Sequence, residues 1–350
     1  MNILFLYSKL AGYTVDCLNA YAKESINNIF VVRYPVHAEA PFTFELEKNI
    51  TVVNKATVKL TDYVKSVNPD LIICSGWFDK EYLQIISHYK KQATTVLMFD
   101  NYWEGTLRQK VGQYLLKLKV VPLFNFCWIP GKIHKDYAHR MGFIEEQIFL
   151  GFYATKLDRF LNVYNPSKKL NNYPKKFVYV GRYLTLKGIE DLWEAFMRFS
   201  EKNNEWELHC IGMGELYDKR VKHPRIIHHG FVQQSDLPQM LSESGVFILP
   251  SHYDHWGMAV QEAAATGLPL LCSNTVGAVS SFLKDTKNGF IFESKNSNDL
   301  ENKMLKIASM SDIELVKFGK ESYNLSQLYT EKTWTKTMKE IEFNATSQRN

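Results

Sequence analysis

Short apolar runs alternate with amphipathic segments along the first half of the chain. The runs, rich in valine, isoleucine and leucine, predict strands at residues 3–7, 28–34, 50–53, 71–74, 95–99 and 126–129. Apolar positions at helical spacing predict helices at residues 14–25, 57–67, 81–90 and 135–141. Because the strands carry apolar residues on both faces, we expect a parallel sheet covered by helices on each side.

The second half repeats this pattern after a polar, turn-rich break at residues 162–176. Strands are predicted at residues 177–182, 206–211, 226–229, 246–249 and 270–273. Helices are predicted at residues 187–200, 236–244, 257–266, 297–310, 312–326 and 330–343. We therefore expect an α/β protein with one domain at residues 1–165 and a second at residues 175–325.

Composition agrees with two domains and indicates the cellular compartment. The chain has 350 residues, of which 45% are hydrophobic, and this is enough for two cores. Its five cysteines, which have no C-x-x-C spacing, predict reduced core residues of a cytoplasmic protein and no zinc or other metal site: Cys17, Cys74, Cys127, Cys210 and Cys272. We expect no membrane span, because no apolar stretch is long enough, and the N-terminus predicts a strand and no signal peptide.

The net charge of +5 is unevenly spread. Residues 105–135 contain six lysines and arginines and no acid, interleaved with leucine, valine and tyrosine. This predicts a basic amphipathic helix that suits anionic lipid headgroups, at about 1 kcal/mol per well-placed basic residue. The alternative is an ordinary helix whose basic face meets water. Nucleic acid is not expected as a partner, because no motif of a nucleic-acid-binding fold accompanies the charge.

Residues 246–270 combine a buried strand, a polar loop and a helix rich in alanine. Pro250 ends the strand, so residues 251–256 form a loop at the carboxyl edge of a sheet, where open α/β sheets bind ligands. Gly257 begins the helix and leaves the N–H groups of its first turn open to an anion. Asp254 and Glu262 can both face a ligand held over this helix start.

These features suit a sugar nucleotide. Its phosphates would bind the amides, its ribose hydroxyls would bind Glu262, and its sugar would bind Asp254. The alternative is an acid that only favours the helix dipole, plus a solvated glutamate. Arg182 and Lys187 lie at the end of one predicted strand and the start of the next helix, where their charges can converge on a diphosphate.

The segment from Pro250 to Glu262 resembles the E-x7-E signature of retaining GT-B glycosyltransferases of family 4, also called glycosyl transferases group 1. Asp254 replaces the first glutamate of that signature, and His255-Trp256 replaces its usual small–aromatic pair. Gly181-Arg182 to Lys187-Gly188 resembles the family's G-R-x4-K-G motif, whose arginine and lysine bind the donor diphosphate.

Weaker matches follow in the family's order. Gly212-Met213-Gly214 resembles its turn under the nucleotide, Gly230-Phe231-Val232 its segment beside the base, and Asn288-Gly289 its N-G hairpin. The resemblance implies donor contacts from eleven residues of the second domain: Gly181, Gly212, Gly214, Phe231, Val232, His255, Trp256, Gly257, Met258, Ala259 and Glu262. It also implies catalytic roles for Arg182, Lys187 and Asp254.

For the first domain the resemblance is limited to the pattern of strands and helices. It implies that a loop containing Gly12 faces the donor diphosphate, and that Asn101 and Trp103 lie on the acceptor side. It further implies a GT-B fold, in which two Rossmann-like, doubly wound parallel-sheet domains face a cleft and a last helix, within residues 326–350, crosses back to the first domain.

The function implied is transfer of a sugar, with retention of configuration, from a nucleotide diphosphate sugar to a glycan or lipid-linked acceptor. UDP is favoured by its frequency in the family, no cofactor is expected, and the setting implied is bacterial cell-surface polysaccharide synthesis. The expected location is the cytoplasm, with peripheral contact to the inner face of the cell membrane through residues 105–135. The alternatives are a GT-B sugar-nucleotide epimerase and a sugar-nucleotide-binding protein without transfer activity.

Overall fold

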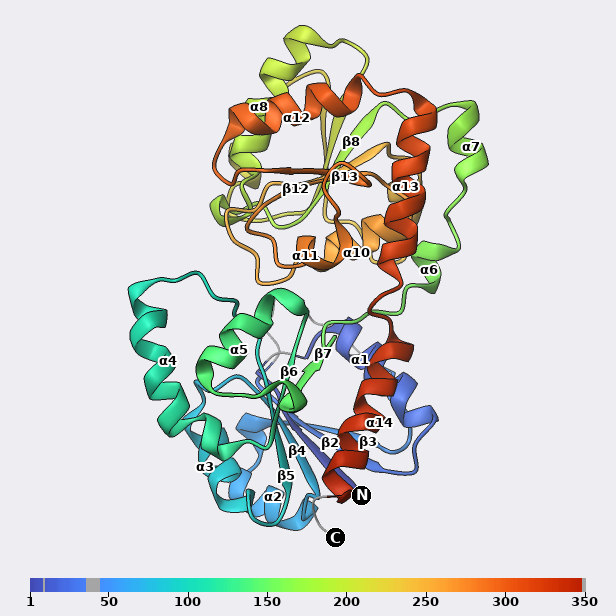
Figure 1. Ribbon diagram of the computed structural model, residues 1–350. Helices are drawn as coiled ribbons and strands as arrows, with labels where there is room; N and C mark the ends of the chain where they lie inside the picture. Colours follow the sequence, from blue (N-terminus) through green and yellow to red (C-terminus); the bar gives the residue numbers. More distant parts are fainter. Residues whose placement is uncertain (9, 36–44, 348–350) are drawn as a thin grey trace. The chain divides into compact units, whose positions relative to one another are not determined.

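The computed structural model describes residues 1–8, 10–35 and 45–347. Its contacts divide the chain into two compact units (Figure 1). Unit 1 comprises Met1–Lys156 and the chain from Tyr329 onward, and unit 2 comprises Leu157–Leu328.

The first boundary lies earlier in the chain than the predicted end at residue 165. Residues 157–165 belong to unit 2 because α6 (Asp158–Leu161) packs against α10 (Met258–Ala265). The polar break also contains a helix, α7 (Pro166–Asn171), which packs against α13 (Asp312–Ser326). Asn165 caps α7 by accepting a hydrogen bond from the N–H of Lys168.

Unit 1 is built on a parallel sheet. Among the described residues the sheet has seven strands in the order β3-β2-β1-β4-β5-β6-β7. The strands are β1 (Asn2–Leu6), β2 (Asn28–Arg33), β3 (Ile50–Asn54), β4 (Leu71–Ser75), β5 (Thr94–Met98), β6 (Phe126–Ile129) and β7 (Ile148–Leu150). The helices are α1 (Gly12–Lys23), α2 (Leu60–Val67), α3 (Lys80–Tyr89), α4 (Leu107–Lys119), α5 (Lys135–Met141) and α14 (Glu331–Ser347).

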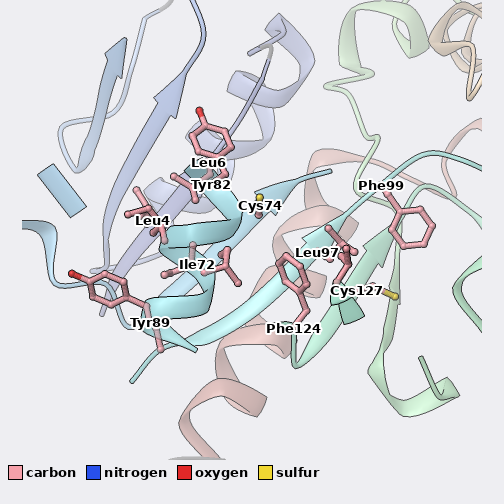
Figure 2. Close-up of a cluster of buried hydrophobic side chains, with 14 of the residues drawn as sticks. Leu4, Leu6, Ile72, Cys74, Tyr82, Tyr89, Leu97, Phe99, Phe124 and Cys127 are labelled. Atoms are coloured by element: carbon pink, nitrogen blue, oxygen red, sulfur yellow. The ribbon is translucent and has the colours of Figure 1, made fainter. Parts of the chain in front are cut away.

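Alternate residues of the unit 1 strands pack on opposite faces of the sheet. On one face the core joins strand residues such as Leu4, Ile72 and Leu97 to Tyr82 and Tyr89 of α3, as Figure 2 shows. Both faces of the sheet are therefore buried from solvent, as the continuous apolar runs predict.

On the opposite face Trp334 of α14 is buried. Its ring lies 4.9 Å from that of Trp128, 6.4 Å from that of Phe5 and 6.3 Å from that of Tyr21, measured between centroids. These aromatic contacts, together with the packing of α14 against α1, attach the last helix to unit 1.

Unit 2, which is described in full, is also built on a parallel sheet. Its six strands have the order β10-β9-β8-β11-β12-β13. The strands are β8 (Lys176–Val180), β9 (Glu207–Ile211), β10 (Ile226–Gly230), β11 (Val246–Leu249), β12 (Leu270–Ser273) and β13 (Gly289–Phe292). Besides α6, α7, α10 and α13, the helices are α8 (Ile189–Lys202), α9 (Leu237–Ser242), α11 (Val279–Phe282) and α12 (Ser297–Ala308).

The hairpin predicted at residues 288–292 is wrong. β13 instead pairs in parallel with β12, with Gly289 opposite Leu270. A Cβ on Gly289 would lie 1.8 Å from the carbonyl oxygen of Leu270, so this position needs glycine for the strands to approach. The Asn288-Gly289 pair therefore serves strand entry and close packing, and makes no two-residue turn.

In the basic stretch at residues 105–135 the helix α4 ends at Lys119, and α5 begins at Lys135. Thr106 caps α4 by accepting a hydrogen bond from the N–H of Gln109. Among the described residues, no helix combines the length and the apolar character needed to cross a bilayer.

Candidate functional site

In both parallel sheets the order of the strands reverses at one point, called the switch point. Strands are added on one side of it first and on the other side afterwards. In unit 2 it lies between β8 and β11, and in unit 1 between β1 and β4. Ligands of open parallel sheets bind outside the carboxyl ends of the strands at such a switch point. In unit 2 these ends lead into Gly181-Arg182 and into the loop of residues 251–256.

Lys187 and Asp254 form an ion pair at the unit 2 switch point. The Nζ atom of Lys187 lies 2.6 Å from Oδ2 of Asp254, and the two side chains are only 24% and 14% exposed. They come from segments 67 positions apart in the chain. The fold thus brings two of the predicted catalytic residues into direct contact.

Close backbone packing holds Lys187 beside the loop. Gly188 has φ +64°, and a Cβ on it would lie 2.0 Å from the carbonyl oxygen of Pro250. The N–H of His252 donates to the carbonyl of Leu186 at 2.9 Å, and the His252 ring lies 2.8 Å from Oδ2 of Asp191 on α8. Only glycine permits this approach, so the position of Lys187 depends on Gly188.

The start of α10 lies next to this ion pair. Gly257, the residue before the helix, has φ +92°, and a Cβ there would lie 3.4 Å from Oδ2 of Asp254. The N–H of Val260 donates to the carbonyl of Gly257, so the N–H groups of Met258 and Ala259 precede the first helical hydrogen bond. These two N–H groups and the Lys187 ammonium make the site favourable for an anion.

A neighbouring turn fixes the loop. The N–H of Gly277 donates to the carbonyl of Asp254 at 3.0 Å, and the N–H of Ala278 donates to that of Trp256 at 2.8 Å. A Cβ on Gly277 would lie 2.1 Å from the carbonyl oxygen of His255, so this contact also requires glycine. The anion site is consequently preorganised by main-chain contacts.

Glu262 follows on α10, about one turn after its start. The side chain is half-buried, and its removal from water raises the pKa of Glu262 to about 7, against the opposing effect of the Arg159 charge. Arg159 lies on α6, and the packing of α6 against α10 brings the two charges near each other. Glu262 is therefore poised to change its charge near neutral pH.

Arg182 follows β8 in the same connection as Lys187. Its side chain is exposed and has no ion pair among the residues that the structure describes, while its carbonyl accepts a hydrogen bond from Tyr179 Oη at 2.7 Å. Cβ atoms on Gly212 and Gly214 would lie 2.0 Å from the carbonyl oxygen of Gly181 and 2.5 Å from that of Tyr183. The Gly-x-Gly turn therefore packs directly against the turn that carries Arg182.

Other predicted donor residues differ in their side-chain surroundings. Phe231 is exposed and Val232 is half-buried after β10. The Trp256 side chain is only 2% exposed and packs edge-on against Phe282, so its ring belongs to the core and only its backbone lies in the loop. The ring of His255 lies 3.2 Å from the hydroxyl of Tyr253.

Unit 1 has a cavity of about 540 Å³ at the carboxyl ends of β1, β4 and β5. It is lined by residues from several segments, among them Ser8, Tyr13, Trp77, Phe78, Asp100, Asn101, Arg108 and Tyr153. The hydroxyl of Tyr153 donates to Oδ2 of Asp100 at 2.8 Å, and the ring of Tyr13 meets that of Tyr153 edge-on. Phe78 is 64% exposed at the cavity and presents an open aromatic face.

The predicted acceptor-side residues lie differently with respect to this cavity. Asn101 lines it, whereas Gly12 begins α1 beside the lining residues Ala11 and Tyr13. The Trp103 ring is covered by the Arg140 guanidinium, 4.3 Å from its centroid, and contacts the ring of Tyr137. Sequence reasoning missed Phe78 and Tyr153, which follow strand ends without any motif around them.

Comparison with known proteins assigns most of unit 2. Residues 163–325 match the family model described as glycosyl transferases group 1. This segment is similar to the domain that group 1 glycosyltransferases share. The anion site at Lys187, Asp254 and α10 lies entirely inside it.

Two relatives of the chain extend the comparison. An uncharacterized glycosyltransferase of Methanocaldococcus jannaschii is 30% identical over 134 residues, which are 36% of this chain and 34% of the relative. The poly(ribitol-phosphate) alpha-N-acetylglucosaminyltransferase of Staphylococcus aureus is 25% identical over 302 residues, 81% of this chain and 59% of the relative. The chain thus matches about a third and about three fifths of the lengths of these two proteins.

Solved structures resemble the whole chain. HepE of Anabaena, crystallised with UDP and glucose, has a TM-score of 0.73 at 15% identity and covers 98% of this chain and 99% of its own. Sucrose-phosphate synthase from Thermosynechococcus elongatus has a TM-score of 0.74 at 15% identity, covering 99% and 100%. Each of the two units contains one parallel sheet, and these solved structures share the fold of the whole chain, so the predicted GT-B fold is confirmed.

Proposed function

We propose that this protein is a retaining glycosyltransferase of family 4. It transfers a sugar from a nucleotide diphosphate sugar, with UDP as the favoured nucleotide, to a glycan or lipid-linked acceptor in bacterial cell-surface polysaccharide synthesis. The observation that carries the proposal is the meeting of Lys187, Asp254 and the start of α10 at the switch point of unit 2, within the segment similar to group 1 glycosyltransferases.

In this proposal the donor diphosphate binds Arg182, Lys187 and the N–H groups of Met258 and Ala259. An ammonium has three donors, so Lys187 can keep its contact with Asp254 and still donate to a phosphate oxygen. Asp254 then accepts from a hydroxyl of the donor sugar beside the bond to be broken, and Glu262 accepts from the ribose hydroxyls. Phe231 and Val232 flank the base.

The chemical step places negative charge on the departing nucleotide. Arg182, Lys187 and the two amides stabilise that charge where it develops, and preorganised stabilisation of this kind is usually the largest catalytic contribution. Retention then follows from attack of the acceptor on the face that the diphosphate leaves, with a phosphate oxygen taking the acceptor proton. No metal or organic cofactor takes part in the proposed step.

The acceptor binds in the unit 1 cavity. Phe78 offers a ring for stacking on a sugar, and Asp100, held by Tyr153, offers a carboxylate to a sugar hydroxyl. The S. aureus relative is named for a polymeric acceptor, poly(ribitol-phosphate), which supports a glycan or glycan-like acceptor here. HepE was crystallised with UDP and glucose, and this supports UDP as the nucleotide.

The proposed enzyme works in the cytoplasm. Its five cysteines all lie among the described residues, and each is a buried free thiol. Free thiols without a disulfide are usual where glutathione and thioredoxin keep cysteines reduced.

The proposal is tested by assaying a panel of nucleotide sugars with glycan and lipid-linked acceptors. We expect sugar transfer from one donor, with a product of the same anomeric configuration, and its near loss in Arg182→Ala and Lys187→Ala. Lys284→Ala, which breaks an ion pair of Lys284 with Glu321 elsewhere in unit 2, is the matched control. An inverted product would overturn the retaining mechanism.

A second candidate is a sugar-nucleotide-binding protein without transfer activity. It is favoured by Asp254, which is one methylene shorter than the family's glutamate and is engaged by Lys187. Such a protein would be stabilised thermally by a nucleotide sugar and would release no sugar from it, with or without an acceptor. Measuring both quantities on the same panel separates the two functions.

A further inference from the structure

The helix α4 presents a row of large apolar side chains to solvent. Its five exposed apolar residues are between 54% and 81% exposed: Leu107, Val111, Tyr114, Leu115 and Leu118. Four of them recur at spacings of four, three and four residues, which places them on one side of a helix. Solitary exposed apolar residues are common on protein surfaces, whereas these five form one continuous apolar strip along a helix.

This row lies opposite the face that α4 packs on unit 1. The inward positions are Gln109, Gly112, Gln113 and Leu116, of which Leu116 is buried and the others are half-buried. At about 100° per residue these positions are centred on the far side of the helix from Leu107, Val111 and Leu118. The outward row therefore takes no part in the core of unit 1, because the opposite side of α4 makes that contact.

Basic side chains flank the apolar row on both sides. On the helix circumference Lys110 and Lys117 fall along one margin of the row, and Arg108 and Lys119 fall along the other. α4 contains no acidic residue. The outer surface thus has an apolar centre and two cationic margins.

We propose that α4 is an interfacial helix that docks unit 1 on an anionic lipid bilayer. Its apolar row enters the boundary between headgroups and acyl chains, and its lysines and arginine lie at the level of the headgroup phosphates. Long basic side chains can extend outward to the headgroups while their stems cover apolar surface. Each well-placed cation contributes about fivefold to the affinity for an anionic surface.

A bilayer explains this surface better than a protein partner of the same kind. The helix has 13 residues and is about 20 Å long, so a row about 10 Å wide offers about 200 Å². Stable protein interfaces need about 800 Å² from each partner. Two copies meeting through α4 would also bring their cationic margins together, which opposes association.

Nucleic acid is also a poor match for α4. Binding to a phosphate backbone is driven by cations that contact it, whereas here the centre of the outer surface is apolar and the cations lie at its edges. This amphipathic arrangement fits a bilayer, in which acyl chains receive the apolar row and the headgroups meet the cations.

Arg108 links the docking helix to the cavity of unit 1. It lies in the first turn of α4 and lines that cavity. If the cavity holds the acceptor, as the proposed function states, docking through α4 brings it to a bilayer and selects an acceptor anchored in lipid. This step rests on the proposed function, whereas docking itself does not.

Docking is tested by sedimenting the full chain with vesicles of phosphatidylcholine alone or mixed with phosphatidylglycerol. We expect binding to the mixed vesicles, reduced by added salt, and little binding to phosphatidylcholine alone. The double variant Val111→Gln/Leu118→Gln should bind at least tenfold more weakly, and Lys110→Gln/Lys119→Gln roughly 25-fold more weakly. Because all four side chains are exposed, these changes leave folding intact.

Matched controls remove equally exposed side chains elsewhere. Ile26→Gln/Ile313→Gln deletes two exposed apolar side chains, and Lys65→Gln/Lys222→Gln deletes two exposed cations. Both should bind like the unaltered chain. Equal binding by the α4 variants and these controls would overturn the proposal, and so would a self-association that the α4 variant abolishes in the absence of vesicles.

A spectroscopic measurement locates the contact. All five native cysteines are buried, so Leu118→Cys provides a uniquely accessible thiol for an environment-sensitive dye, and Ile313→Cys provides the control. We expect mixed vesicles to shift the emission at position 118 to shorter wavelength and to leave that at position 313 unchanged. Equal shifts at both positions would show nonspecific adsorption and contradict docking through α4. None of these measurements depends on transferase activity, so docking and the proposed function can fail separately.

Discussion

The two units gather polar residues at the same edge of their sheets but hold them in different ways. In unit 2 the switch-point site depends on main-chain contacts, in which Gly188, Gly212 and Gly277 let one backbone segment touch another. In unit 1 the cavity is lined by side chains, such as Phe78 and the Asp100–Tyr153 pair, that come from separate strand ends.

The difference follows from what each site would bind. A diphosphate is small, charged and the same in every donor, so amides, glycines and fixed cations suit it. A sugar acceptor is recognised by stacking and by individual hydroxyl contacts, which side chains supply. We therefore expect changes in unit 2 to affect the chemical step or the fold itself, and changes in the unit 1 cavity to affect acceptor recognition.

The largest effect is expected from Lys187→Ala. Loss of the ammonium removes charge stabilisation of the departing diphosphate, so kcat should fall by about 10²–10³ while donor KM changes little. Steady-state kinetics measures this, with Lys284→Ala as the control. If kcat stayed within twofold of the unaltered enzyme, Lys187 would have no role in the chemical step, and the contrast between the units would lose its chemical basis.

The next prediction compares the stability effect of replacing a glycine in close backbone contact with that of replacing a glycine that has free space around it. Gly188→Ala forces a Cβ to within 2.0 Å of the Pro250 carbonyl oxygen at a positive φ, so it should destabilise the protein by about 3 kcal/mol and weaken donor binding. Gly112→Ala on α4 meets no atom within 4 Å and should stabilise by about 0.5–1 kcal/mol. Denaturant unfolding of both variants measures the difference. Similar changes in the two would show that the contact at Gly188 is not rigid.

Much of the fold followed from the hydrophobic pattern. Three elements have the predicted bounds: the strands Val246–Leu249 and Leu270–Ser273 and the helix Asp312–Ser326. In each, the pattern of apolar residues is uninterrupted and is bounded by a strong breaker or cap. β7, a half-buried edge strand, and the short helices α6 and α7 were missed, because their sequences are brief or polar. Their structure depends on tertiary contacts that no local pattern records.

The candidate donor site could be recognised because its parts are local. Gly181-Arg182 and Lys187-Gly188 lie in one short connection between β8 and α8, so their spacing can be read from the sequence. The pairing of Lys187 with Asp254 was not predicted, since it joins segments 67 positions apart in the chain. The unit 1 cavity draws residues from position 7 to position 153, so sequence spacing carries no information about it.

A third prediction concerns the carboxyl of Glu262, whose pKa is raised to about 7. Between its unfolded value near 4.5 and about 7, the folded state keeps a proton that the unfolded state loses. The free energy of unfolding should therefore fall as pH rises through this window, by about 1–2 kcal/mol after allowance for partial solvation.

Glu262→Gln mimics the protonated side chain and should lose this part of the pH dependence, while Glu190→Gln, an exposed change on α8, should keep it. Urea unfolding between pH 5 and pH 8 measures the slopes. Equal slopes for Glu262→Gln and the unaltered protein would mean that Glu262 is solvated and ionised throughout. Donor KM should rise in Glu262→Ala, because the ribose hydroxyls lose an acceptor.

The smallest effects are expected in the unit 1 cavity, where recognition is divided among several side chains. Phe78→Ala removes an exposed ring and should raise acceptor KM about tenfold, with donor KM and stability unchanged. Tyr153→Phe removes the hydrogen bond to Asp100 and the hydroxyl that also interacts with Tyr13, so acceptor KM should rise by a few fold. Phe343→Ala changes another exposed phenylalanine, on α14, and this control should leave all these quantities unchanged. If Phe78→Ala raised donor KM and left acceptor KM unchanged, the cavity would bind the donor. The acceptor would then have to bind in unit 2.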